Sequence, residues 1–189
     1  MILGILSDTH GRHERCAAAL RALRALGADA FVHCGDIGDE LVLDRLAGLR
    51  VWFVWGNTDA PLASLARYAA NIGLTPPATT PVWIELDGRR FAVLHGHERA
   101  FADAYHAALH GGADEVARRI GVCDAILHGH THVAGDTSIG GVRFINPGAL
   151  HRAPVHTVCT LDTRSLETAF WRIDDRESAT PERWSPPED

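Results

Sequence analysis

Seven side chains of types that commonly bind metal ions follow short apolar runs in this 189-residue chain. They are Asp8, His10, Asp36, Asn57, His95, His130 and His132. Carboxylate oxygens, imidazole nitrogens and an amide oxygen together suit divalent transition metals. Two ions about 3.5–4 Å apart also need a shared carboxylate to offset their mutual repulsion. The residue types therefore favour a two-metal hydrolytic site.

The elements that must position these ligands are short apolar segments of the chain. Residues 2–6, 30–33, 51–54, 91–94 and 125–127 are apolar runs that end in glycine or polar residues. This pattern is typical of buried strands, and ligands just beyond strand ends meet at one edge of a sheet. We therefore expect the seven side chains to converge.

The first half of the chain alternates expected strands with expected helices. Residues 12–26 place apolar side chains near helical spacing, and residues 39–46 and 61–68 are expected to form two further helices. A βαβαβ pattern predicts a parallel sheet.

The second half of the chain begins with an expected hairpin. Asp87-Gly88 separates two apolar runs, and this pair suits a type I′ turn. Residues 97–122 are expected to be helical with a break at Gly111-Gly112. Further short strands are expected at residues 136–139, 142–145, 157–161 and 166–173. The predicted fold class is mixed α/β (α+β), a four-layer α-β-β-α sandwich of two mixed β-sheets flanked by helices.

Length and composition favour one domain at residues 1–173. Apolar residues make up 46% of the chain, but no apolar run approaches the ~20 residues that span a bilayer, so no membrane partner is expected. The first residues lack the basic segment of a signal peptide. Residues 174–189 mix charge with proline and are expected to be a disordered tail, with docking of Trp184 left open.

Charge and cysteine content exclude several classes of function. All 18 basic residues are arginine, so mechanisms that use a Schiff-base or Walker lysine are excluded. The four cysteines form no C-x-x-C unit, which argues against a zinc ribbon and favours a cytoplasmic location. A net charge of -6 argues against a general nucleic-acid groove. A homo-oligomer stays open.

Six ordered blocks of the sequence resemble those of the calcineurin-like metallophosphoesterases. The blocks are Asp-Thr-His-Gly at 8–11, Gly-Asp at 35–36, Gly-Asn-Thr-Asp at 56–59, His-Gly-His at 95–97, Gly-His-Thr-His at 129–132 and Asn-Pro-Gly at 146–148. Any one block alone could be an ordinary turn, but six in order are specific. Within the superfamily the chain is most similar to the small single-domain bacterial and archaeal phosphodiesterases.

This resemblance implies a metal site with two halves. One half consists of Asp8, His10, Asp36 and His132, and the other consists of Asp36, Asn57, His95 and His130. Asp36 then bridges two divalent ions. Manganese is the favoured ion, while iron, zinc, cobalt and nickel stay open because the ligand set accommodates each of them.

The implied activity is hydrolysis of a small organic phosphate ester by attack of a metal-bridging hydroxide on phosphorus. A nucleotide is one candidate substrate. A phosphodiesterase is favoured, and a phosphomonoesterase with the same site is the alternative. A third hypothesis is a non-catalytic, protein-binding scaffold that resembles a eukaryotic retromer subunit of this fold. The full ligand set argues against the scaffold.

The candidate catalytic residues are Asp36, Asn57 and His97, and the candidate substrate-binding residues are Arg12, Asn57 and His97. Many relatives carry a histidine that assists the leaving group where this chain has Thr58. Threonine cannot supply a proton at neutral pH. We therefore expect that esters with acidic leaving groups react best, or that His97 or a metal-bound water supplies the proton.

The remaining histidines are expected to have structural roles. His33 and His128 lie in or beside apolar runs and should be hydrogen-bonded core imidazoles. The others are expected at the surface or in packing contacts: His13, His106, His110, His151 and His156.

Overall fold

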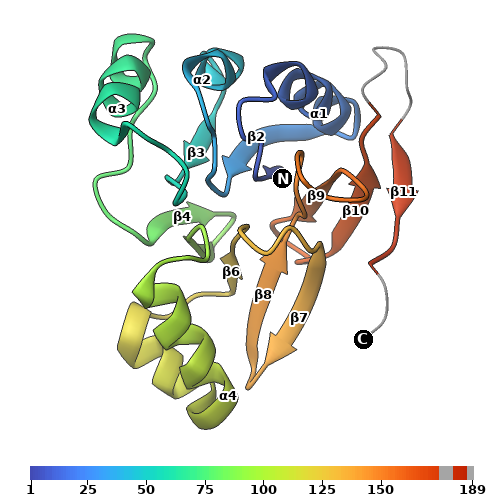
Figure 1. Cartoon of the computed structure of the whole chain (residues 1–189). Helices are drawn as coiled ribbons and strands as arrows, with labels where there is room; N and C mark the ends of the chain where they lie inside the picture. Colours follow the sequence, from blue (N-terminus) through green and yellow to red (C-terminus); the bar gives the residue numbers. More distant parts are fainter. Residues whose placement is uncertain (175–180, 187–189) are drawn as a thin grey trace.

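Two β-sheets lie face to face at the centre of the molecule, with helices on both outer sides (Figure 1). The computed structural model describes residues 1–174 and 181–186. Among these residues no helix is long and apolar enough to cross a membrane. The four cysteines are all free.

The first sheet has the strand order β11-β10-β9-β1-β2-β3. At its centre, β1 (Ile2–Leu6), β2 (Ala28–His33) and β3 (Val51–Phe53) run parallel to one another. β9 (Thr157–Asp162) pairs antiparallel with β1, and β10 (Thr168–Arg172) pairs antiparallel with β9. The predicted parallel βαβαβ unit is confirmed.

Three helices join the parallel strands. They are α1 (His13–Ala25), α2 (Glu40–Leu46) and α3 (Leu62–Asn71). The carboxylate of Asp39 accepts a hydrogen bond of 3.1 Å from the backbone N–H of Val42 and caps the start of α2. All three helices lie within a few residues of their predicted positions.

The second sheet has the strand order β4-β5-β6-β8-β7. Its strands are β4 (Val82–Leu86), β5 (Arg89–Val93), β6 (Ala125–Leu127), β7 (Gly135–Ile139) and β8 (Val142–Asn146). β4 and β5 form the predicted hairpin, and both turn residues have positive φ, 50° at Asp87 and 77° at Gly88. Parallel pairs at β5–β6 and β6–β8 make this sheet mixed as well.

The long helix α4 (Arg99–Ile120) covers the outer face of the second sheet. Its backbone leaves helical geometry at Gly112, where φ is 67° and ψ is -165°. The predicted break at the glycine pair is therefore confirmed. Gly112 supplies a backbone conformation that side-chain-bearing residues rarely adopt.

Three separate apolar clusters account for the four layers. Side chains of β1 alternate between two of these clusters, because Leu3 and Ile5 face the second sheet whereas Leu6 faces the helices. A third cluster, which includes Ile126 and Phe144, lies between the second sheet and α4. The structure confirms the predicted sandwich of two mixed sheets flanked by helices.

The C-terminal segment differs from the prediction of a disordered tail. β11 (Glu182–Trp184) pairs antiparallel with β10, and the ring of Trp184 lies 6.5 Å from that of Phe170. The open edge of β10 offers unpaired backbone groups, which composition alone does not reveal. The prediction is wrong for β11. Residues 175–180 and 187–189 of the predicted tail lie outside the described residues.

Candidate metal centre

The seven predicted ligands follow the carboxyl ends of strands from both sheets. β1, β2 and β3 of the first sheet lead into the loops that carry Asp8 and His10, Asp36, and Asn57. β5 and β6 of the second sheet lead into the loops that carry His95, His130 and His132. The candidate site therefore lies where the two sheets meet.

Two groups of these side chains approach closely enough to hold a metal ion. Asp8, His10 and His132 form one group, and Asp8, Asp36 and His95 form the other, with the ligand atoms in each group within 4.8 Å of one another. Oδ2 of Asp36 lies 3.5 Å from Nε2 of His10 and 3.5 Å from Nε2 of His95. Asp36 thus lies between the two groups of imidazoles.

The remaining predicted ligands lie on the His95 side of the site. Oδ1 of Asn57 is 3.2 Å from Nε2 of His95, and the ring of His130 is 5.0 Å from that of His95. On the other side, Nε2 of His132 lies 3.2 Å from Oδ1 of Asp8. The structure brings all seven side chains together.

The hydrogen bonds of two imidazoles show that the donor set fits cations. Nδ1 of His95 lies 2.7 Å from the carbonyl oxygen of Cys34, and Nδ1 of His132 lies 3.3 Å from that of Arg152. A carbonyl oxygen only accepts hydrogen bonds, so Nδ1 carries the proton of each neutral ring and Nε2 presents a lone pair. These lone pairs face the oxygens of Asp36 and Asp8.

One carboxylate oxygen in the site lacks the partner that burial normally requires. Oδ1 of Asp8 is fully buried and accepts no hydrogen bond from the described residues. A buried oxygen without a partner is costly, and facing lone pairs repel each other. Cations between these atoms would remove both costs, so the residues present fit a metal centre.

Burial and hydrogen bonding set the charge of the ligands. Burial raises the pKa of Asp8. Burial also opposes ionisation of Asp36, but hydrogen bonds from His95 and from the backbone N–H of Thr58 hold its pKa below the ordinary range. Burial lowers the pKa of His10 to about 4, so this imidazole is neutral at pH 7.

His95 behaves differently from His10. Burial lowers its pKa, but hydrogen bonds to Asp36 and to the carbonyl oxygen of Cys34, with the nearby charge of Asp8, raise the pKa above 6.5 overall. In the metal-free protein a proton on Nε2 therefore takes the position between ring and carboxylate that a cation would take.

We predict that Mn²⁺ affinity rises with pH by up to about tenfold per unit while His95 titrates, because binding displaces one proton. A pKa raised in the folded state gives stabilisation that is full below 6.5 and lost as pH rises through the folded pKa. The Tm of the metal-free protein should therefore fall over this range. Calorimetric titrations across a pH series measure the affinity, and a flat profile above pH 6.5 would contradict the assignment.

The backbone around the ligands adopts uncommon conformations. Five of the eight non-glycine residues with positive φ in the described part of the chain are predicted ligands. They are Asp8, His10, Asp36, His130 and His132. This left-handed region is unfavourable for residues with a Cβ atom, and it persists where surrounding contacts enforce it. The ligand loops are thus held by tertiary contacts.

Two acidic side chains provide such contacts, and sequence reasoning assigned neither of them a role. The carboxylate of Asp59 accepts hydrogen bonds of 2.7 Å from the backbone N–H groups of Gly38 and Gly56. Glu98 accepts hydrogen bonds from the N–H groups of His95, at 2.8 Å, and Gly96, at 2.7 Å. Asp59 ends the block at 56–59, and Glu98 directly follows the block at 95–97. This proximity to the blocks was the only sign in the sequence of their role.

Asn146 holds the loop that carries the last two ligands. Its amide nitrogen donates to the carbonyl oxygen of Gly129 at 2.8 Å and to Oγ1 of Thr131 at 2.9 Å. Its amide oxygen accepts from the N–H of Gly148 at 2.9 Å. The Asn-Pro-Gly block therefore forms a turn and also stabilises the loop that carries His130 and His132 through hydrogen bonds.

The predicted substrate-binding side chains lie around the ligand cluster. The His97 side chain is 35% exposed, and its ring lies 5.4 Å from that of His95. Arg12 is exposed at the start of α1, on the opposite side of the site from His97.

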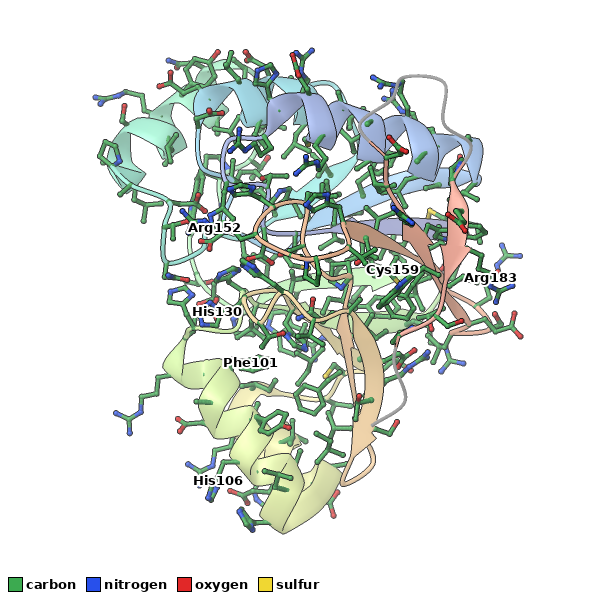
Figure 2. The ribbon with its side chains drawn as sticks, turned by 45° about the vertical axis from the view of Figure 1, so that its right-hand side comes forward. Phe101, His106, His130, Arg152, Cys159 and Arg183 are labelled. Atoms are coloured by element: carbon green, nitrogen blue, oxygen red, sulfur yellow. The ribbon has the colours of Figure 1, made fainter. Side chains whose placement is uncertain are left out.

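His151 was expected only at the surface or in packing, but its ring lies 5.8 Å from that of His10. Its pKa is lowered by burial and then by the nearby charges of Arg12 and Arg152. In Figure 2, Arg152 and His130 lie above Phe101 at the start of α4. A cationic rim, defined as Arg12 and Arg152, thus lies near His151 on the His10 side of the site.

Of the two histidines expected in the core, His33 is buried there, whereas His128 is half-buried, and both are hydrogen-bonded. Nε2 of His33 lies 3.0 Å from Oγ1 of Thr9, and Nδ1 accepts a hydrogen bond from the N–H of Gly35 at 3.2 Å. Nδ1 of His128 lies 3.2 Å from the carbonyl oxygen of Gly129. Both act in packing beside the site and not within it.

The comparison with known protein families shows which family the chain belongs to. Residues 1–166 match the model of the calcineurin-like phosphoesterase superfamily domain. The chain belongs to this superfamily. The resemblance read from the six blocks is confirmed, and the protein is a phosphoesterase-family member for which the family implies divalent metal ions.

Individual relatives of this phosphoesterase agree with that assignment. Phosphodiesterase MJ0936 of Methanocaldococcus jannaschii is 26% identical over 171 residues, which cover 88% of this chain and 96% of that protein. The solved structure of an archaeal phosphodiesterase has a TM-score of 0.74 at 23% identity and covers 92% and 100% of the two chains. Vps29 of Entamoeba histolytica, solved in complex with Zn²⁺, has a TM-score of 0.60 at 19% identity, with 97% and 98% coverage.

Proposed function

We propose that this protein is a metal-dependent phosphodiesterase that hydrolyses a small organic phosphate ester, with a nucleotide as one candidate. The supporting observation is the convergence of the Nε2 atoms of His10, His95 and His132 on the carboxylate oxygens of Asp8 and Asp36. A divalent cation is the chemical species that such a donor set accommodates best. Family membership supplies the phosphoester chemistry.

The proposed centre holds two ions. Asp8, His10, Asp36 and His132 bind one ion, and Asp36, Asn57, His95 and His130 bind the other. Two ions held there would supply positive charge for the phosphoryl oxygens and would lower the pKa of a bound water. Manganese is the favoured ion, and zinc is the second candidate because Vps29 of Entamoeba histolytica was solved with Zn²⁺.

Several side chains position the reacting groups. The N–H of Thr58 donates to Oδ1 of Asp36 at 2.9 Å, which leaves Oδ2 free to face the imidazoles. Asn57 and His97 lie near His95. Together with Asp36 they are the proposed catalytic residues, and both are also proposed to contact the substrate. Arg12 in the cationic rim is the proposed contact for a substrate oxygen that carries negative charge.

Thr58 orients a ligand and does not act as an acid. Its Oγ1 lies 3.3 Å from Nδ1 of His10, so the hydroxyl fixes the ring of a proposed ligand. The proton for a poor leaving group must therefore come from another donor. The half-exposed imidazole of His97 is the proposed donor.

We predict that His97→Ala steepens the dependence of kcat/KM on leaving-group pKa. Aryl phosphodiesters with acidic leaving groups should lose less than threefold, whereas those with basic leaving groups should lose about 10²-fold, the usual contribution of a general acid. His106→Ala, on α4 and outside the ligand cluster, is the matched control. Equal slopes in wild type and His97→Ala would contradict this role.

A metal-reconstituted screen distinguishes the proposed function from its alternatives. The chain is loaded with Mn²⁺, its bound ions are counted, and it is assayed against matched phosphodiesters and phosphomonoesters, including cyclic nucleotides. Preference for diesters supports the proposal, and preference for monoesters supports the phosphomonoesterase. Absence of hydrolysis with two ions bound would favour the non-catalytic scaffold.

A further inference from the structure

A cavity lies beside the loop that carries His130 and His132, away from the candidate metal centre. Its volume is about 870 Å³, and its walls come from α4, β7, β8 and the C-terminal segment. This volume falls within the range of about 300–1,000 Å³ that is typical of ligand sites. None of the seven proposed metal ligands lines it. The cavity is therefore separate from the metal centre.

Aromatic rings form much of the cavity wall. Phe101 and Tyr105 of α4 are stacked with ring centroids 6.2 Å apart, and the ring of Phe144 on β8 lies 5.4 Å from that of Tyr105. Tyr105 is 40% exposed and Val133 is 62% exposed, so both apolar surfaces are open to an incoming molecule. Such a wall favours a flat, apolar ligand.

The cavity lining carries no free charge among the described residues. Asp136 is its one carboxylate, and both oxygens of Asp136 accept hydrogen bonds from Arg143 while Thr168 donates to one of them. The ring of His128 packs against that of Phe101, with centroids 4.7 Å apart, and its Nδ1 lies 3.2 Å from the carbonyl oxygen of Gly129. A charged ligand would find no opposite charge here.

One polar group in the lining is available to a ligand. Oγ1 of Thr131 accepts hydrogen bonds from the amide of Asn146 at 2.9 Å and from the N–H of Val133 at 3.4 Å. Both acceptor positions of the hydroxyl are thereby used, and its proton has no acceptor within the described residues. Thr131 can therefore donate to one acceptor atom of a bound molecule.

The same threonine belongs to the metal-ligand loop. Thr131 lies between His130 and His132, and Asn146 ties it to Gly129 at the start of the loop. A molecule in the cavity would contact Thr131, while a metal ion would contact the imidazoles of His130 and His132 on either side of it. The shared loop is a physical connection between the two sites, and any coupling of their affinities through it must be reciprocal.

We propose that this cavity binds a neutral, planar, largely apolar molecule with one hydrogen-bond acceptor, and that its occupancy is coupled to metal binding through the loop of residues 128–134. This site is additional to the proposed phosphoester site. It does not depend on which phosphoester is hydrolysed.

The test uses the neutral fluorescent probe 6-propionyl-2-(dimethylamino)naphthalene, whose ketone oxygen accepts a hydrogen bond, with the Mn²⁺-loaded full chain. Wild type should bind one equivalent of probe. Val133→Glu should weaken binding at least tenfold, because it places an unpaired charge at the cavity, whereas Val122→Glu, at a valine that is 70% exposed elsewhere, should change it less than twofold. Failure to bind probe, or equal loss in both variants, would overturn the proposal.

A second pair of variants acts away from the metal loop. Tyr105→Ala should weaken probe binding at least tenfold, whereas Leu109→Ala, on the same helix and 54% exposed, should change it less than twofold. The anionic probe 8-anilino-1-naphthalenesulfonate, which has the same naphthalene ring but carries a sulfonate, should bind more weakly than the neutral probe. Equal or tighter binding of the sulfonate would contradict the neutral lining.

Coupling is measured by titrating the probe into metal-free and Mn²⁺-loaded protein. The two dissociation constants should differ at least threefold, and saturating probe should shift the Mn²⁺ affinity by the same factor. Equal constants would overturn the coupling. These readouts are binding measurements, so they hold whether or not the phosphodiesterase proposal succeeds.

Discussion

Asp36→Asn should reduce kcat/KM for a phosphodiester by at least about 10³-fold, because loss of a shared metal ligand removes several kcal/mol of transition-state stabilisation. Oδ2 of Asp36 lies 3.5 Å from the Nε2 atoms of both His10 and His95. Asparagine offers one oxygen and no charge. Its amide nitrogen would donate hydrogen bonds toward these imidazoles and occupy the space intended for a cation.

Steady-state kinetics and a count of bound metal test this result together. The number of ions bound per chain should fall in Asp36→Asn, while the metal-free variant stays folded. Asp29→Asn makes the same charge change at an exposed position on β2 and should leave both quantities unchanged. Full activity and full metal content in Asp36→Asn would disprove the shared role of this carboxylate.

Gly56→Ala should have the second-largest effect, because the added methyl group would clash with Asp36. A Cβ atom at this position would collide with Oδ1 and the backbone nitrogen of Asp36. The backbone nitrogen cannot move aside as a flexible side chain could, so the carboxylate or the loop of Asn57 must shift. Because ångström-scale misplacement of reacting groups costs about 10²-fold, we expect a loss of at least that size in kcat/KM.

Gly135→Ala provides the matched control. A Cβ atom at Gly135 would meet nothing within 4 Å, so the same substitution should leave activity and Mn²⁺ affinity within about twofold of wild type. Kinetics and calorimetric titration with Mn²⁺ measure both variants. Equal, small effects of the two substitutions would show that the Asp36 carboxylate need not occupy its observed position.

Side chains outside the candidate ligand set also hold the loops of the site in place. Asp59 and Glu98 each accept two backbone hydrogen bonds in a ligand loop, and Asn146 holds the loop beyond β6. Such contacts compensate for the unfavourable backbone conformations at the ligands. The geometry of the metal centre is therefore a property of several loops together.

The sequence by itself determined most of the elements and the candidate ligand set. Apolar runs that end in glycine or polar residues revealed the strands, since burial imposes its pattern locally. Ligand positions followed from these strands because the carboxyl ends of parallel strands share an edge, as Asp8, Asp36 and Asn57 do. The Asp87-Gly88 turn and the break at Gly112 were equally local and were also found.

Only the tertiary structure decided the contacts between distant segments. β11 forms because β10 presents an open edge, and His151 lies beside His10 because the loop after Asn146 crosses the start of α1. The cavity behind Thr131 arises from the spacing between α4 and β7. Local pattern reports how one segment is buried, whereas these features depend on which segments pack together and how far apart they lie.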